Sequence, residues 1–475
     1  MAHKVEIMSP VDVAWLSMDE PTNLMMVNGI LTFDRPLDVD RFRRVIEYRW
    51  LRYERFKLRV VQPRLPITRP YWESDHNFNL DNHIHRVALP KPGDQATLQD
   101  MVSDLMSQPL DFSRPPWHFY IIENFGDGCA LMARIHHCVA DGMALVGVLL
   151  SMTDFRADAP LLPMDEVIGA LPEDGLIGGM TREAANTATT LRNTADWAIH
   201  ETREAIQDGK RARRLVERGA GFGIAATRLL ARSNDPSTRL KGSLGVMKRA
   251  AWSAPTPLSE VKLVKNILGG TINDVIITAV AGGLRRYLIA HGDDVDNLEF
   301  RAAVPVNLRN GQDGGKLGNK FGLVFLCLPI HIGEPLIRLV EVRRRMAELK
   351  RSAEAPVTLG ILGMMGVGND LFREFVVQTL EPKATVVLTN VPGPPVPLYM
   401  AGEEIKDIMF WVPQAGRLGV GISILSYANR LYIGVATDAG LVPEPVGILD
   451  GFHIELEQLK NVALAVKSTD GYQAR

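Results

Sequence analysis

Residues 135–142 read Ile-His-His-Cys-Val-Ala-Asp-Gly, and this stretch joins two apolar segments of the chain. Residues 129–134 before it are mostly apolar and follow the turn signal Gly-Asp-Gly at 126–128, which indicates a buried strand. Residues 143–150 after it are also apolar and predict a buried helix. His136 and His137 therefore stand where a strand ends and a helix begins.

The two histidines are expected to have different surroundings. Adjacent side chains on a strand point to opposite faces, so His136 and His137 are not expected to bind one ligand together. We expect one imidazole to face a cavity and the other to pack inward. Gly142 is expected to let the backbone turn tightly and to leave room for a bulky group beside it. Together these features predict a functional site.

The length of 475 residues predicts more than one domain, because a single core rarely grows to that size. We divide the chain into an N-terminal domain at residues 1–160, a helical linker at 161–245 and a C-terminal domain at 246–475. The linker prediction rests on prolines and glycines that interrupt the pattern and on a basic cluster at 210–218. Strands are expected at 25–33, 119–123, 323–330 and 384–391, with a hairpin at 418–438.

Composition narrows the class of protein. The net charge of −2 gives no general attraction to nucleic acid. The three cysteines lie in apolar runs, which argues for a reducing compartment, and the N-terminus has no signal-peptide pattern. No window of about 18 residues is apolar enough for a spanning helix. We therefore expect a cytoplasmic protein, with any membrane contact peripheral, at the inner face of the plasma membrane.

Other candidate sites are weaker. His83 and His85 have the spacing of two ligands on one strand face, but no third ligand lies close in sequence, so no metal site is expected. The absence of a Gly-x-Ser-x-Gly elbow argues against a serine hydrolase. Residues 270–285 predict a long buried helix capped by Thr271 or Asn273, with Asp274 in its first turn. On these grounds alone, Asn273 and Asp274 fit a helix cap as well as a site.

The stretch at 136–142 resembles the His-His-x-x-x-Asp-Gly signature of CoA-dependent acyltransferases related to chloramphenicol acetyltransferase and to peptide-synthetase condensation domains. The whole chain more narrowly resembles the bacterial wax ester synthase/diacylglycerol acyltransferase family, through the Asn-Asp pair at 273–274 and through residues 317–322 and 384–395. Two positions depart from that family: Pro116 replaces its leucine, and Asn307 replaces its serine. The resemblance covers both predicted domains and fails only in the linker.

The resemblance implies an α/β fold of two chloramphenicol-acetyltransferase-like domains, each a mixed sheet flanked by helices, with a channel between them. It implies that His137 is the general base and that His136 and Gly142 shape the site around it. Asp141 is expected to hold the turn through an ion pair, and Asn273 to donate a hydrogen bond to the oxyanion. If the family's serine has that second role, the amide of Asn307 offers a donor in its place.

The implied reaction is direct acyl transfer. A thioester carries a good leaving group, so the reaction needs one base and an oxyanion donor, and histidine suits the base role near neutral pH. The expected substrates are fatty acyl-CoA, as co-substrate without a further cofactor, and diacylglycerol or a long-chain alcohol, met at a membrane or lipid-droplet surface. Two alternatives stay open: a condensation-type acyltransferase with another alcohol or amine acceptor, and a non-catalytic lipid-binding relative.

Overall fold

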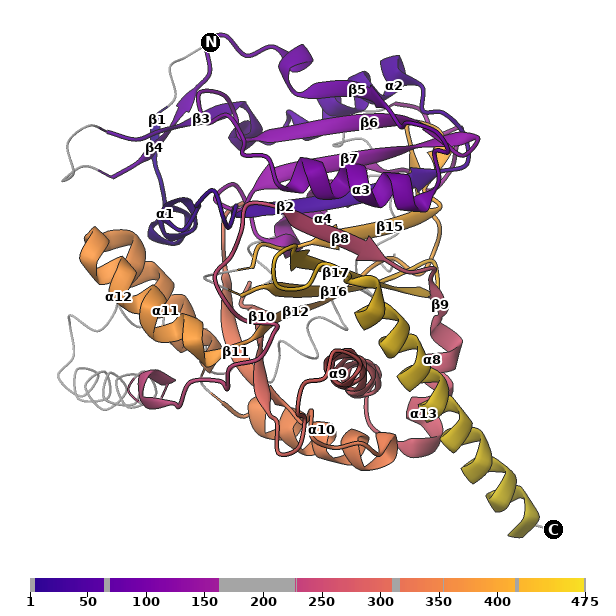
Figure 1. Cartoon of the computed structure of the whole chain (residues 1–475). Helices are drawn as coiled ribbons and strands as arrows, with labels where there is room; N and C mark the ends of the chain where they lie inside the picture. Colours follow the sequence, from indigo (N-terminus) through magenta and orange to yellow (C-terminus); the bar gives the residue numbers. More distant parts are fainter. Residues whose placement is uncertain are drawn as a thin grey trace, which may run out of the picture.

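The computed structural model describes residues 5–63, 69–161, 227, 229–309, 317–352, 354–414 and 418–473. Most of the predicted linker at 161–245 lies outside these residues. The described chain forms two main sheets, with the N-terminal sheet above the C-terminal sheet in Figure 1. The predicted α/β architecture of helix-flanked mixed sheets is confirmed.

The N-terminal sheet has five strands, and one of them comes from the far end of the chain. Its only parallel pair is β5 with β6. The fifth strand, β15, pairs with β2 although it lies within the predicted C-terminal domain. The order is β15 (Asp407–Trp411), β2 (Met26–Phe33), β7 (Gly128–His136), β6 (Trp117–Phe125) and β5 (Ile84–Ala88).

The C-terminal sheet is also mixed, because β10 and β16 run parallel to β12 while the other pairs are antiparallel. The short β9 (Thr256–Pro257) extends it by pairing with β17. The order is β11 (Phe321–Leu328), β10 (Phe300–Asn307), β12 (Val386–Pro392), β16 (Val420–Tyr427), β17 (Arg430–Asp438) and β8 (Lys248–Trp252).

Helices cover both faces of the C-terminal sheet. Val386 and Leu388 face a core built with α9 and α13, whereas Val387 between them faces a smaller core built with α11. This alternation is the ordinary period of two along a strand. The helices of this half are α8 (Leu258–Leu268), α9 (Ile272–Ala290), α10 (Pro335–Leu349), α11 (Glu354–Val367), α12 (Asp370–Leu380) and α13 (Val446–Gln473).

The N-terminal half adds shorter elements around its sheet. Phe42 of α2 and Trp50 of the π-helix that follows it (Ile46–Trp50) both make ring contacts with Phe119 of β6. These two segments therefore cover one face of the N-terminal sheet. Helix α3 (Gln95–Met106) lies at the junction with the C-terminal sheet. The hydroxyls of Ser103 and of Ser107, which follows the helix, accept hydrogen bonds from the backbone of β8. The remaining elements are α1 (Pro10–Ser17), α2 (Val39–Val45), α3 (Gln95–Met106), α4 (Gly142–Met152) and a small sheet of β1 (Val5–Ile7), β4 (Tyr71–Ser74) and β3 (Leu58–Val61).

Local signals predicted most of these elements. The hairpin at 418–438 forms with Ala428 and Asn429 in its turn, both at positive φ, as a two-residue turn between right-twisted strands requires. Thr271 caps α9 in a capping box with Asp274.

Among the described residues, no single helix has both the length and the hydropathy to cross a membrane. The bent pair of α8 and α9 passes that test together, with an angle of 102° between the two helices.

Helix α11 fixes α1 against the C-terminal sheet. A Cβ atom on Gly366 of α11 would collide with the backbone of Pro10, so the two helices touch through their main chains. At the other end of α11, the Thr358 hydroxyl donates to the Leu323 carbonyl (2.9 Å) and accepts from the Leu323 amide (2.6 Å) on β11. The positions of α1 and β11 therefore both depend on α11.

We predict that Gly366→Ala destabilises the protein by about 1–3 kcal/mol, because overpacking pushes α11 away from α1. The matched control is Gly363→Ala on the same helix, where an added Cβ would meet nothing within 4 Å. That control is expected to be neutral or to stabilise by about 0.5–1 kcal/mol, since alanine favours helix. Urea unfolding followed by tryptophan fluorescence measures both, and equal midpoints for the two variants would contradict the packing argument.

Candidate active site

His137 is held by backbone hydrogen bonds from both halves of the molecule. Strand β7 ends at His136, and the His137 amide donates to the Met25 carbonyl (2.7 Å) beside β2. The His137 carbonyl accepts from the side-chain amide of Asn319 (2.8 Å), which precedes β11. Because both bonds are made by buried groups, the main chain at His137 has little freedom.

His137 packs against two aromatic side chains and is 4% exposed. Trp15 of α1 stacks on it with 4.2 Å between ring centroids and 22° between planes, and Phe321 of β11 lies 5.5 Å away. No hydrogen bond to a described residue engages either ring nitrogen, and Nδ1 is buried without a partner. A ring nitrogen is therefore free to accept a proton.

Burial lowers the pKa of His137 to about 4. The negative charge of Asp141 opposes this shift, and the positive form of His136 reinforces it. The imidazole is thus neutral at physiological pH, as a proton acceptor must be.

His136 points into a different environment, as the strand geometry predicted. Its Nδ1 accepts a hydrogen bond from the Cys138 amide (3.1 Å), and its Nε2 lies 3.4 Å from a carboxylate oxygen of Asp19. Phe112 contacts the ring edge-on, and the His136 amide donates to the Pro116 carbonyl (3.0 Å). His136 is therefore built into the wall beside His137.

Asp141 forms the predicted ion pair. Its carboxylate accepts from Nε of Arg309 (3.1 Å) and from an Arg309 terminal nitrogen (2.8 Å), and it also accepts the Lys320 amide (2.9 Å). The same side chain caps α4 through the Ala144 amide (2.9 Å). These bonds join the N-terminal turn to the C-terminal half, and none of them reaches the His137 ring. Asp141 acts on His137 through its charge and not as a member of a catalytic triad.

Asp12 and Trp15 were not predicted as site residues. The Asn319 amide nitrogen that holds His137 also donates to Asp12 (2.9 Å), which is buried and lies near Arg55 (3.4 Å). Burial raises the pKa of Asp12, against the opposing effects of Asn319 and Arg55. The available sequence signal was the helix start at Ser9, whose side chain accepts the Asp12 amide, with Trp15 three residues further along the same helix.

Gly142 differs from its expected role. It begins α4 without the left-handed φ of a tight turn, so that part of the expectation is wrong. A Cβ atom there would meet nothing within 4 Å, which agrees with open space beside this residue. The glycine is therefore not required by the conformation of the turn.

The structure does not bring Asn273 to His137. Asn273 is exposed in the first turn of α9, where its side-chain oxygen accepts from Asn390 of β12 (2.7 Å). Asn307 is better situated, because it pairs directly with Phe321 across β10 and β11, and side chains of such a pair share one face of the sheet. Its side-chain oxygen accepts the Arg309 amide (3.0 Å), which leaves the NH₂ group available within the described structure.

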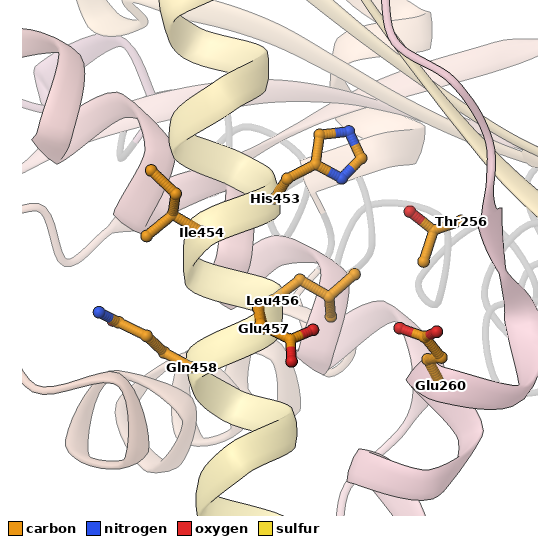
Figure 2. Close-up of a pocket in the computed structure, with 7 residues that line it drawn as sticks. All are labelled: Thr256, Glu260, His453, Ile454, Leu456, Glu457 and Gln458. Atoms are coloured by element: carbon orange, nitrogen blue, oxygen red, sulfur yellow. The ribbon is translucent and has the colours of Figure 1, made fainter.

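One cavity of the described structure lies away from this cluster. It measures about 480 Å³ and opens between α8 and α13, where Figure 2 shows His453 pointing toward Thr256. A second cavity of about 30 Å³, room for about one water molecule, lies between the sheets beside Met26, Asn28 and Lys248. His137 lines neither cavity, so the channel through the site stays a prediction.

The histidine pairs do not assemble a metal centre in the described ranges, where no group of three or more potential ligands gathers. His83 bonds through Nδ1 to the Trp117 carbonyl (2.8 Å) and stacks on that indole. His85 shares a hydrogen bond with His118 (2.6 Å).

Two solved structures show which class of fold this chain has. The first condensation domain of the calcium-dependent antibiotic synthetase has the same fold, with a TM-score of 0.58 at 14% identity over 96% of each chain. The wax ester synthase/diacylglycerol acyltransferase from Marinobacter aquaeolei VT8 superposes with a TM-score of 0.68 at 21% identity, over 96% of this chain and 99% of that one. This chain therefore has the same fold as both of these proteins.

Sequence comparison then gives the family. Residues 8–276 match the wax ester synthase/diacylglycerol acyltransferase catalytic domain, and residues 317–460 match the C-terminal domain of the same family. Two Mycobacterium tuberculosis proteins named as diacylglycerol O-acyltransferases are each 28% identical, one over 96% of this chain and 90% of its own length, the other over 87% and 86%. The chain belongs to the wax ester synthase/diacylglycerol acyltransferase family, and it is an acyltransferase.

The environment of His137 predicts a specific pH dependence. If His137 must be neutral, kcat/KM should be constant above about pH 5 and fall as the pH passes through about 4. Asp141→Asn keeps an N-cap for α4 but removes the charge that raises the pKa of His137, so the acid limb should move to lower pH. Loss of the buried pair should also cost about 3–5 kcal/mol of stability.

Tryptophan fluorescence at each pH separates this effect from acid unfolding. The folded-state pKa of His137 lies below its ordinary value of 6.5, so the unfolded chain binds the proton between these values and stability decreases as the pH falls from 6.5 to 4. An acid limb that moves upward in the folded Asp141→Asn variant would contradict the charge argument.

Proposed function

We propose that this acyltransferase moves a fatty acyl group from acyl-CoA to the free hydroxyl of diacylglycerol, and of long-chain alcohols, with His137 as general base. The observation that carries the proposal is the state of His137, which is buried, neutral and without a hydrogen bond to a described residue at either ring nitrogen. The products are triacylglycerol or wax ester, and free CoA. No cofactor is needed beyond acyl-CoA as co-substrate.

The chemistry requires one proton acceptor. His137 takes the proton of the acceptor hydroxyl as its oxygen attacks the thioester carbonyl carbon, which gives a tetrahedral oxyanion and an imidazolium. The oxyanion collapses, the bond from carbon to sulfur breaks, and the thiolate of CoA receives the proton from the imidazolium. No acyl-enzyme forms, because the CoA thiolate is a good leaving group: the pKa of a thiol is about 8.5.

We propose Asn307 as the oxyanion donor in place of Asn273. Three contacts support this choice: Asn307 pairs with Phe321, Phe321 contacts the His137 ring, and the Asn307 oxygen is held by the Arg309 amide. That arrangement orients the NH₂ group of the asparagine as a fixed donor. An oxyanion is stabilised best by donors that are already oriented before the reaction.

The acceptor class rests on the family and on the apolar surroundings of the site. Relatives are named as diacylglycerol O-acyltransferases, and Trp15 and Phe321 surround the base with aromatic carbon. Such walls suit a lipid hydroxyl better than a charged amine. We also propose a cytoplasmic enzyme that meets its acceptor at the surface of a membrane or a lipid droplet.

The proposal predicts that palmitoyl-CoA releases thiol in the presence of dioleoylglycerol or hexadecanol. His137→Ala should lower the rate by about 10²–10⁴-fold, the usual contribution of a general base. His453→Ala, a histidine bonded to Ser253 beside the α8 and α13 cavity, serves as control and should retain turnover. Thiol release with an amine but with neither alcohol would indicate the condensation-type alternative. Binding of acyl-CoA without any thiol release would indicate a lipid-binding protein.

The two asparagines provide a second test. Asn307→Ala should lower kcat by about 10²–10³-fold with a small change in KM, since the donor acts on the transition state. Asn273→Ala removes an exposed side chain and should change kcat by less than about threefold. Steady-state kinetics on both variants, with circular dichroism as a check of folding, distinguishes them. The reverse ranking would restore the oxyanion role first expected for Asn273.

A further inference from the structure

Large apolar side chains are exposed where α11 ends and α12 begins. Leu371 is 76% exposed, more than any other large hydrophobic residue in the described part of the chain, and Phe375 is 60% exposed. We call the set of exposed residues at this corner the apolar tip, and its members are Met364, Val367, Leu371, Phe372 and Phe375. Figure 1 shows α11 and α12 at one edge of the molecule, on the opposite side from α13.

The apolar tip has a defined shape. The Gly368 amide donates to the Met364 carbonyl (2.8 Å), and a Cβ atom on Gly368 would meet the ring of Phe372. Asn369 then caps α12 by accepting the Phe372 amide (2.9 Å). The side chains of both helix ends are therefore fixed at one corner and not spread along a loop.

The apolar tip is not a by-product of core packing. The opposite face of α11 already buries Ile361, Leu362 and Met365 in the smaller core between α11 and the C-terminal sheet. Residues 355–369 contain no charged side chain, and the first charge beyond them, Asp370, is paired with Arg373. The remaining charge of this corner, exposed Glu374, accepts a hydrogen bond from Gln378 (2.9 Å), so the charges beside the apolar tip are engaged within α12.

The same helix leads to the proposed base. Gly366, one residue before Val367, packs on Pro10 at the start of α1, and α1 carries Trp15, which stacks on His137. Thr358 joins α11 to β11, which carries Phe321. The apolar tip is thus connected to both aromatic walls of the site through direct contacts.

We propose that the apolar tip inserts into a neutral lipid surface and docks the site next to a lipid-dissolved acceptor, an inference that rests on the proposed function. Helices that expose apolar side chains bind at such surfaces in proportion to the apolar area they bury. A stable protein interface commonly needs about 20–30 residues a side, whereas the apolar tip has five. A lipid surface needs no such complementarity.

The test is flotation of the full-length protein with phosphatidylcholine vesicles, with and without dioleoylglycerol. Leu371→Ser/Phe375→Ser should lower the vesicle partition coefficient by at least about tenfold, because burial of one large apolar side chain alone accounts for roughly that factor. The matched control is Ile337→Ser/Val340→Ser on α10, where the residues are 59% and 58% exposed. The control should bind like the unchanged protein, and binding should persist at high salt.

Activity separates docking from catalysis. The tip variant should lose transfer to dioleoylglycerol in vesicles by a similar factor and keep transfer to a water-soluble short-chain alcohol. Equal flotation of the tip and control variants, loss of binding at high salt, or a change of oligomeric state in the tip variant would overturn the proposal. If the unchanged protein releases no thiol with any acceptor, the proposed function fails, and flotation still decides whether the apolar tip binds lipid.

Discussion

Burial of a neutral histidine at the junction of two sheets is the constraint on which the rest of the structure depends. A buried backbone amide and carbonyl must be paired, and at His137 the partners come from Met25 on one side and Asn319 on the other. Asn319 is itself bonded to Asp12, so α1 and the start of β11 are fixed relative to the histidine. The ring then packs against Trp15 and Phe321, in surroundings that keep it uncharged.

The negative charge of Asp141 acts on His137 without a hydrogen bond between the two side chains. Asp141 is fully engaged by Arg309, the Lys320 amide and the cap of α4, so it has no bond left for the imidazole. A direct bond from a carboxylate would stabilise the imidazolium and raise the pKa. At a distance, Asp141 only moderates the effect of burial. His136 has different surroundings, because its Nδ1 accepts the Cys138 amide and its Nε2 lies 3.4 Å from Asp19.

Helix α11 connects this site to the outside of the molecule. One of its faces is packed so closely that Gly366 touches the backbone of α1, and the other leads to exposed Val367. Packing on one face and exposure on the other is usual for a surface helix, but here the exposed face is also apolar. The rigid contacts of the inner face allow the outer face to have a separate role in recognition.

The sequence by itself determined the local elements and their chemistry. Periodicity gave β7 and α4, capping residues gave the start of α9, and the family motif identified His137 and the ion-pairing role of Asp141. Only the tertiary structure decided that β15 completes the N-terminal sheet, that Trp15 covers the histidine, and that Asn307 rather than Asn273 neighbours Phe321. Each of these features brings together residues that are more than ten positions apart in the sequence, and β15 and β2 are several hundred positions apart. Local propensity and spacing do not encode such contacts, because they arise from strand pairing and core packing between distant segments.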